Sequence, residues 1–150
     1  KQMQFHKAKK LGLDFHVRRE FPSQGIVAIK TASGRTAFSS PELTALDLFY
    51  FQSACGGFDN ICLVIRGLIP KLTASGLKQM THSYPNPSSV QRLGYLLENL
   101  KAQAALILPL KEWVKKNNPA AVALTPIYPK KGHIDSFWRV IKNKKIEIAS

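Results

Sequence analysis

The sequence is poor in several residue types, and each scarcity narrows what the chain can be. It has two cysteines, Cys55 and Cys62, among 150 residues. Two thiols without histidines at zinc-finger spacing favour reduced core cysteines over a disulfide or a metal site. The longest apolar runs, such as residues 102–110, are too short to span a bilayer, and the N-terminus shows no signal-peptide pattern. We therefore expect a cytoplasmic protein.

Acidic residues are also scarce. Nine Asp and Glu stand against 22 Lys and Arg, which gives a formal net charge of +13. The excess is uneven, with +6 in residues 1–40, +3 in 41–117 and +4 in 118–150. A positive field of this size attracts polyanions, and nucleic acid is the commonest one in a cytosol. We favour proximity to nucleic acid over a basic surface that only keeps the protein soluble.

Sequence motifs typical of enzyme active sites are missing as well. The sequence holds no nucleophile elbow, phosphate loop or dinucleotide glycine pattern. Its four histidines share no Asp or Cys spacing and are expected to be ordinary residues, not ligands: His6, His16, His82 and His133. Glu42, Asp47 and Asp59 could form the acidic metal set of a nuclease. However, Glu42 and Asp59 lie near expected helix starts, where a carboxylate complements the dipole. We expect no catalytic residue, metal or cofactor.

The N- and C-terminal parts of the chain have the alternation of β-strands. Residues 3–7 and 13–17 alternate, and the apolar run 26–29 precedes a turn that contains Gly34. This pattern predicts a hairpin of about 26–31 with 35–38. Near the C-terminus, residues 121–124, 137–141 and 145–148 also have the pattern of strands.

Between these parts the apolar period changes to about 3.6, which is typical of helices. Ser39-Ser40-Pro41-Glu42 predicts a helix start, and Gly56-Gly57 predicts the end of that helix. If Ser39 is the N-cap, Glu42 closes a capping box. Further helices are expected near 58–70, 73–83, 88–100 and 102–116, with Pro109 kinking the last or marking its true beginning. The fold class is α+β, in which the terminal strands form one small, mostly antiparallel sheet packed against four or five central helices.

Two charged residues lie beside apolar helical faces. Asp47 stands between two leucines, and Arg92 precedes Leu93 near a helix N-terminus. An unpaired buried carboxylate is costly, and a cation at that end opposes the helix dipole. We therefore predict a charge-assisted hydrogen bond between Asp47 and Arg92. Trp113 and Trp138 are expected in the core or at an edge, in preference to stacking on a base.

Three segments are distinctive in combination. They are SSPELTALDL at 39–48 followed by GGFD at 56–59, QRLGYLLE at 91–98, and WRVIKN at 138–143 followed by Ile146-Glu147. In this order and spacing they resemble the C-terminal domain of the AbiEi antitoxin family, as does Phe5-His6-Lys7-Ala8. The resemblance covers nearly the whole chain, so we interpret residues 1–150 as one such domain.

The resemblance implies a function. Members of the family usually carry an N-terminal winged helix-turn-helix that binds operator DNA and represses their own operon. None is visible ahead of Lys1, so we assign no operator reading to this chain. The C-terminal domain is associated with neutralising a cognate nucleotidyltransferase-like toxin in a type IV abortive-infection pair, for which a stable complex is not assumed. The resemblance thus implies a bacterial phage-defence antitoxin and transcriptional regulator, not an enzyme.

The basic residues at the two chain ends are expected to form one surface, because pairing of the terminal strands would bring them together. Such a surface suits contact with the DNA backbone or with an acidic toxin. Its residues are Lys7, Lys9, Lys10, Arg18, Arg19, Lys130, Lys131, Lys142, Lys144 and Lys145. The alternative function is a stand-alone basic nucleic-acid-binding domain.

Overall fold

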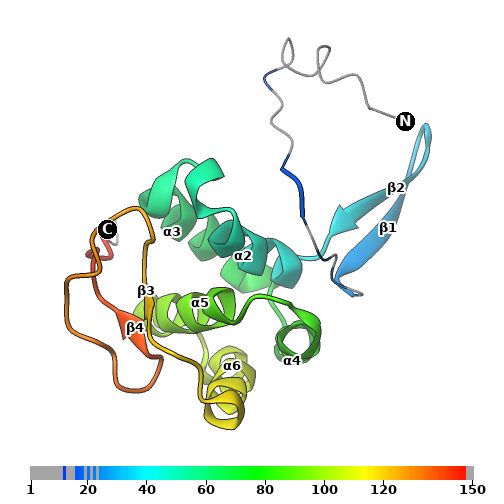
Figure 1. The fold of residues 1–150 in the computed structure, drawn as a ribbon. Coiled ribbons are helices and arrows are strands. Elements are labelled where there is room, and N and C mark those ends of the chain that lie inside the picture. The colour runs from blue at the N-terminus through cyan, green and yellow to red at the C-terminus, as the bar shows by residue number, and fades with distance from the viewer. Residues whose placement is uncertain (1–11, 13–15, 19, 21, 23, 148–150) are drawn as a thin grey trace.

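The computed structural model describes residues 12, 16–18, 20, 22 and 24–147. A group of α-helices forms the centre of this described part (Figure 1). A hairpin of strands β1 (Ile26–Thr31) and β2 (Gly34–Ser39) lies on one side of the helices. The short strands β3 (Val122–Ala123) and β4 (Val140–Ile141) lie on the other side. This arrangement confirms the predicted α+β class.

The central helix is α5, and the others pack around it. The helices are α2 (Pro41–Tyr50), α3 (Gly57–Leu68), α4 (Ala74–Ser83), α5 (Pro87–Asn99) and α6 (Ala104–Asn117). Helix α5 contacts both α2 and α6, while α4 packs on α6 and α3 on α2. The apolar stripe of α5, which predicted a helix, is fully buried at Val90, Leu93, Leu96 and Leu97. No helix in the described residues is long and apolar enough to cross a membrane.

The helix starts follow local capping chemistry. Ser40 caps α2, since its Oγ accepts from the N–H of Leu43 at 3.1 Å. Ser39 is therefore not the cap, and the conditional capping box with Glu42 does not form. Thr73 and Asn86 cap α4 and α5 in the same way. Helix α6 begins at Ala104, so Pro109 lies inside the helix and does not mark its beginning.

The prediction of one sheet built from both chain ends is wrong for the described residues. Strand β1 pairs antiparallel with β2, and β3 pairs parallel with β4 in a separate sheet. The hairpin closes locally at Gly34, which has the predicted positive φ, and β2 runs into α2 after one residue. The helices therefore separate the two sheets (Figure 1). The expected strands at 3–7 and 13–17 fall largely outside the described residues, and 145–147 form none.

Candidate functional site

One polar cluster in the described part lies around Asp47 on α2. Its Oδ1 is 2.7 Å from Nη2 of Arg18 and accepts from the Tyr84 hydroxyl at 2.6 Å. The Arg18 guanidinium lies 5.0 Å from the Tyr50 ring centre and 5.1 Å from that of Tyr84, in the range of cation–π attraction. Burial raises the pKa of Tyr84, and the bond to Asp47 raises it further, so the phenol stays protonated. This Asp47 cluster fastens Arg18 to the helices.

The predicted bond between Asp47 and Arg92 is therefore wrong, because each residue has other partners. Arg92 donates through Nε to the carbonyl of Ala123 at 2.8 Å and through Nη1 to the Ser88 hydroxyl at 3.3 Å. Burial lowers the pKa of Arg92, since no carboxylate of the described residues offsets the desolvation. Arg92 thus anchors the chain after α6, and does not join α5 to α2.

Two glutamines extend this anchoring of the C-terminal segment. Gln91 Nε2 donates to the carbonyl oxygens of Ala120 at 3.0 Å and Trp138 at 3.1 Å. Gln52, in a short 3-10 helix (Gln52–Ala54) after α2, donates to the carbonyl of Leu124 at 3.1 Å. Buried side-chain amides therefore satisfy backbone carbonyl groups that flank the short strands β3 and β4. Residues 91 and 92 belong to the distinctive motif 91–98, but sequence reasoning missed this role.

The three carboxylates considered for a nuclease do not converge. Glu42 is buried and accepts from the backbone N–H of Thr73 at 2.9 Å and from its hydroxyl at 3.0 Å. Asp59 pairs with Lys144 at 3.1 Å, and Asp47 belongs to the cluster described above. Within the part of the chain that the structure describes, no group of three His, Cys, Asp or Glu could hold a metal ion. Each carboxylate instead holds two segments together.

The cysteines and Trp138 lie where core residues are expected. Cys55 is half-buried, Cys62 is buried, and both are free thiols. Burial, assisted by Asp59, raises the pKa of Cys62 to about 11, so this thiol is protonated and unreactive at neutral pH. Trp138 is fully buried, which confirms its expected place in the core.

The C-terminal lysines of the predicted basic surface lie near one another. Asn143 donates to the carbonyl oxygens of Thr125, Tyr128 and Pro129 at 2.8, 3.2 and 3.2 Å. These bonds hold the loop that carries Lys130 and Lys131 beside the segment that carries residues 142–145. The exposed lysines of this C-terminal basic group are Lys130, Lys131, Lys142 and Lys145.

Two lysines here have local acidic partners. Lys142 lies 3.4 Å from Asp135, and Lys144 lies 3.1 Å from Asp59. Their charges are thus partly offset within the protein, whereas no described carboxylate lies within 4 Å of Lys130, Lys131 or Lys145 in an ion pair. Those three lysines are the ones available to an external anion.

Of the N-terminal residues of the predicted surface, the structure places only Arg18, and Arg18 does not join this group. The Arg18 side chain is 8% exposed and faces Asp47, so it is not available to a phosphate. Lys7, Lys9, Lys10 and Arg19 lie outside the described residues. The hairpin and the C-terminal strands lie on opposite sides of the helices (Figure 1). The premise of a sheet shared by both chain ends does not hold for the described residues, and Arg18 is buried against Asp47. The place of Lys7, Lys9, Lys10 and Arg19 on a common basic surface stays a prediction.

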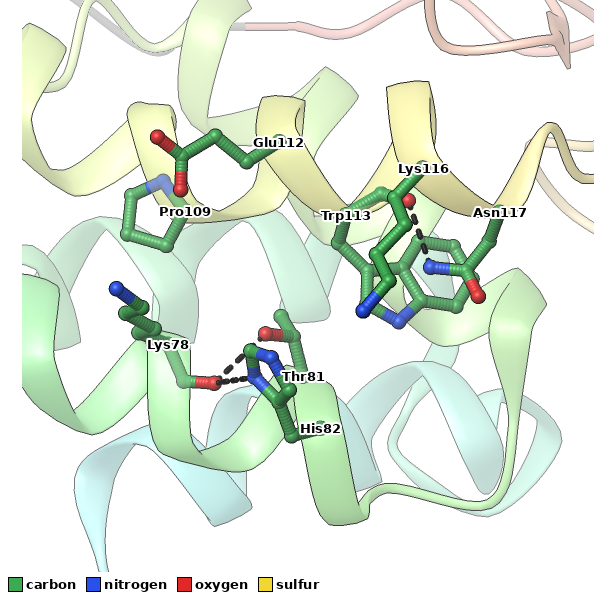
Figure 2. A pocket seen from close by; sticks show the side chains of 8 residues that line it. All are labelled: Lys78, Thr81, His82, Pro109, Glu112, Trp113, Lys116 and Asn117. Atoms are coloured by element: carbon green, nitrogen blue, oxygen red, sulfur yellow. Dashed lines mark hydrogen bonds between the residues drawn. The ribbon is translucent and has the colours of Figure 1, made fainter.

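A hollow of about 300 Å³ opens between α4 and α6 (Figure 2). Its lining combines charged, polar and aromatic side chains, which are Lys78, Thr81, His82, Pro109, Glu112, Trp113, Lys116 and Asn117. His82 Nδ1 and the Thr81 hydroxyl both donate to the carbonyl of Lys78, at 2.7 and 2.8 Å. Neither group is thus arranged as a nucleophile beside a base. Half-buried Trp113 also lines a second hollow at the start of α5.

Comparison with known proteins gave one finding. A family model described as the AbiEi antitoxin C-terminal domain matches residues 8–99, which include β1, β2 and α2 to α5. Neither the comparison with curated proteins nor that with solved structures gave a match. The matched range ends before the C-terminal segment, which the structure nevertheless ties to α5 through Gln91 and Arg92.

Proposed function

Because this chain belongs to the AbiEi antitoxin C-terminal domain family, which has an antitoxin role in toxin–antitoxin systems, we propose that it neutralises a cognate nucleotidyltransferase-like toxin. The pair would be a bacterial type IV abortive-infection system that acts in the cytoplasm against phage. The observation that carries the proposal is the match over residues 8–99. We further propose that all of 1–150 acts as one antitoxin domain, which the bonds from α5 to the C-terminal segment support.

Antitoxin domains of this family are generally not enzymes, and we propose that this one neutralises without a catalytic residue of its own. The polar residues that could have carried chemistry are engaged in structural contacts. Asp47 bonds to Tyr84, Glu42 to Thr73, and Asp59 pairs with Lys144. Neutralisation then depends on contact with another protein or on regulation. Any residues that make such a contact must be exposed.

We also propose that the domain assists autorepression of its operon in the intact antitoxin. The support is the +13 charge and the C-terminal basic group, in which Lys130, Lys131 and Lys145 are exposed. Lysine contacts to phosphate give affinity without reading sequence, so base recognition would come from another domain. A stand-alone nucleic-acid-binding domain has the same charge in its favour, but the family match favours the antitoxin.

Co-expression tests the proposal. The gene beside this one should encode a protein that arrests growth when expressed alone, and this chain should restore growth. Glu42→Gln, Asp59→Ala and His133→Ala should restore growth as the parent does, provided that circular dichroism shows a folded protein. His6→Ala is a fourth variant and should also restore growth; residue 6 lies outside the part of the chain that the structure describes. A folded parent chain that fails to restore growth but binds DNA would favour the nucleic-acid-binding alternative. A folded His133→Ala variant that fails would point to chemistry in the domain.

A further inference from the structure

The hollow between α4 and α6 is built from one face of each helix (Figure 2). Its residues on α6 recur at spacings of three and four, so they lie on one side of the helix: Pro109, Glu112, Trp113, Lys116 and Asn117. The residues on α4 follow the same spacing, and they are Lys78, Thr81 and His82. Thr81 and Pro109 are buried, whereas the charged side chains are exposed. The hollow is thus a cleft between two packed helices with a charged rim.

Trp113 supplies the aromatic wall of the hollow. Its side chain is half-buried, whereas Trp138 is fully buried. Asn117 Nδ2 donates to the carbonyl of Trp113 at 2.8 Å, but the indole N–H of Trp113 has no acceptor among the described residues. An indole N–H that is removed from water normally finds a hydrogen-bond partner. An aromatic face with a free donor at its edge suits an aromatic ligand that carries acceptors.

The rim of the hollow supplies cations from both helices. Lys78 and Lys116 form no ion pair with a described carboxylate. His82 Nδ1 donates to the carbonyl of Lys78, because a carbonyl can only accept, and this leaves Nε2 for a ligand. Figure 2 shows His82 between the two lysines. Two unpaired ammonium groups from different helices form a place for a phosphate.

A nucleotide matches all of these groups. Its base can lie against the indole of Trp113, and its phosphate can lie between the lysines. Glu112, which has no ion-pair partner among the described residues, can accept from ribose hydroxyls, as acidic residues do in dinucleotide sites. An apolar ligand would leave the lysines and the indole N–H without partners, and inorganic phosphate would leave Trp113 unused. The volume of about 300 Å³ suits one nucleotide unit.

The hollow adjoins two others that share its walls. Trp113 and Asn117 also line a hollow of about 450 Å³ at the start of α5, and Lys78 and His82 line another along α4. Proteins that bind single strands combine cations along the backbone with aromatic side chains on which successive bases stack. The nucleotide in the hollow can therefore be free, or it can be one unit of a single strand that continues into the neighbouring hollows.

We propose that the hollow between α4 and α6 is a nucleotide-binding site, in which a base stacks on Trp113 and a phosphate is held by Lys78 and Lys116. This inference goes beyond the proposed antitoxin function and does not depend on it. It also differs from the proposed contact between the C-terminal basic group and duplex DNA. A duplex keeps its bases stacked inside, so it cannot place one on Trp113.

Fluorescence and calorimetry of the full-length chain test the site. The probes are ribonucleoside monophosphates, the matching nucleosides and a single-stranded RNA trinucleotide. Binding of a base should quench the fluorescence of Trp113, while buried Trp138 supplies a constant background. Trp113→Leu should weaken nucleotide binding by about tenfold or more, and Trp113→Phe should retain most of it because the ring still stacks. Thermal unfolding checks that the variants remain folded.

A pair of matched lysine variants tests the phosphate contact. Lys78→Gln with Lys116→Gln should weaken nucleotide binding by about tenfold but leave nucleoside binding unchanged, because only the nucleotide carries a phosphate. Lys71→Gln with Lys115→Gln is the control, since these exposed lysines lie outside the hollow and the change of net charge is the same. Tighter binding of the trinucleotide than of the monophosphate would identify a strand as the ligand. Equal affinity would identify the free nucleotide.

Three results would overturn the proposal. One is the absence of quenching and of binding heat with nucleotides at millimolar concentration. Another is equal weakening by the two lysine pairs, which would mean that only net charge matters. The third is a folded Trp113→Leu variant that binds nucleotide as the parent does. A parent chain that binds nucleotide but does not restore growth would leave this site standing and remove only the antitoxin function.

Discussion

Asp47 is the residue at which Arg18, α2 and the end of α4 meet. Its carboxylate is held by Arg18 and Tyr84, and the aromatic rings of Tyr50 and Tyr84 flank the arginine. Sequence reasoning recognised that an Asp between leucines needs a partner, but it chose Arg92. The sequence neighbourhood of Arg18 carries no helix pattern that could have revealed the true contact.

Asp47→Ala should destabilise the protein by roughly 2–3 kcal/mol, because it leaves the buried Arg18 guanidinium without a counter-ion and the Tyr84 hydroxyl without an acceptor. Asp59→Ala is the control, since Asp59 is 62% exposed and its solvent-exposed pair with Lys144 should contribute little to stability. Urea unfolding measures both. In double-mutant cycles Asp47 should couple to Arg18 and not to Arg92. Equal losses for the two alanine variants would contradict this account.

Glu98 makes the stability of the protein depend slightly on pH in the acid range. Its bond to Lys111 chiefly lowers its pKa, burial opposes this, and the bond from Trp138 Nε1 at 2.6 Å assists. A folded pKa below the unfolded value of about 4.3 means stabilisation above that pH, which is lost as pH falls through the folded pKa. Glu98→Gln should therefore be less stable than the parent at pH 6, and the difference should vanish near pH 3. Unfolding midpoints of the parent and the variant between pH 3 and pH 6 measure this difference. A difference that does not change with pH would show that the charge of Glu98 is not its cause.

At the scale of elements, α5 packs very closely against the C-terminal segment, with Gly94 facing the ring of Trp138. A Cβ on Gly94 would lie 2.0 Å from Cζ3 of Trp138, whose side chain is fully buried and cannot move aside. Gly94→Ala should thus destabilise the protein by about 1–3 kcal/mol through overpacking. Gly67→Ala in α3 is the matched control, because no atom lies within 4 Å of its Cβ, and it should stabilise the helix by about 0.5–1 kcal/mol. Thermal unfolding of both variants measures the opposite signs. Two stabilised variants would show that Trp138 can yield.

Local rules predicted the elements better than their mutual contacts. The Ser-Ser-Pro-Glu start of α2, the stripe of α5 and the turn at Gly34 each depend on residues a few positions apart, and all were predicted. The contacts of Gln91 and Arg92 with the C-terminal segment join residues about 30 to 50 positions apart. Such contacts have no periodic signature, so the sheet arrangement and the candidate site could not be derived from pattern alone. The exposure of the hairpin side chains was also missed, because alternation of apolar and polar residues does not say whether a strand is covered.

At the scale of the whole molecule, the hairpin of β1 and β2 and the C-terminal basic group lie on different sides of the helices (Figure 1). The hairpin of β1 and β2 exposes apolar side chains, while the C-terminal basic group is a cluster of lysines around a loop fixed by Asn143. The helices between them separate the two sheets (Figure 1). The C-terminal basic group can therefore be altered without touching the hairpin.

This separation makes a quantitative prediction about salt. Lys130→Glu, Lys131→Glu and Lys145→Glu together should weaken binding of the chain to duplex DNA of any sequence. Each lost phosphate contact lowers the slope of log affinity against log salt by about 0.9, so the slope should fall by roughly 3. A control triple variant has the same change of net charge but places it on the helices, and it should keep most of the slope. Its substitutions are Lys71→Glu, Lys115→Glu and Lys116→Glu. Fluorescence anisotropy at several salt concentrations measures it. If the two triple variants bind DNA alike, only overall charge matters and the C-terminal basic group is not a DNA surface. If the first variant instead fails to neutralise the toxin, those lysines face the toxin.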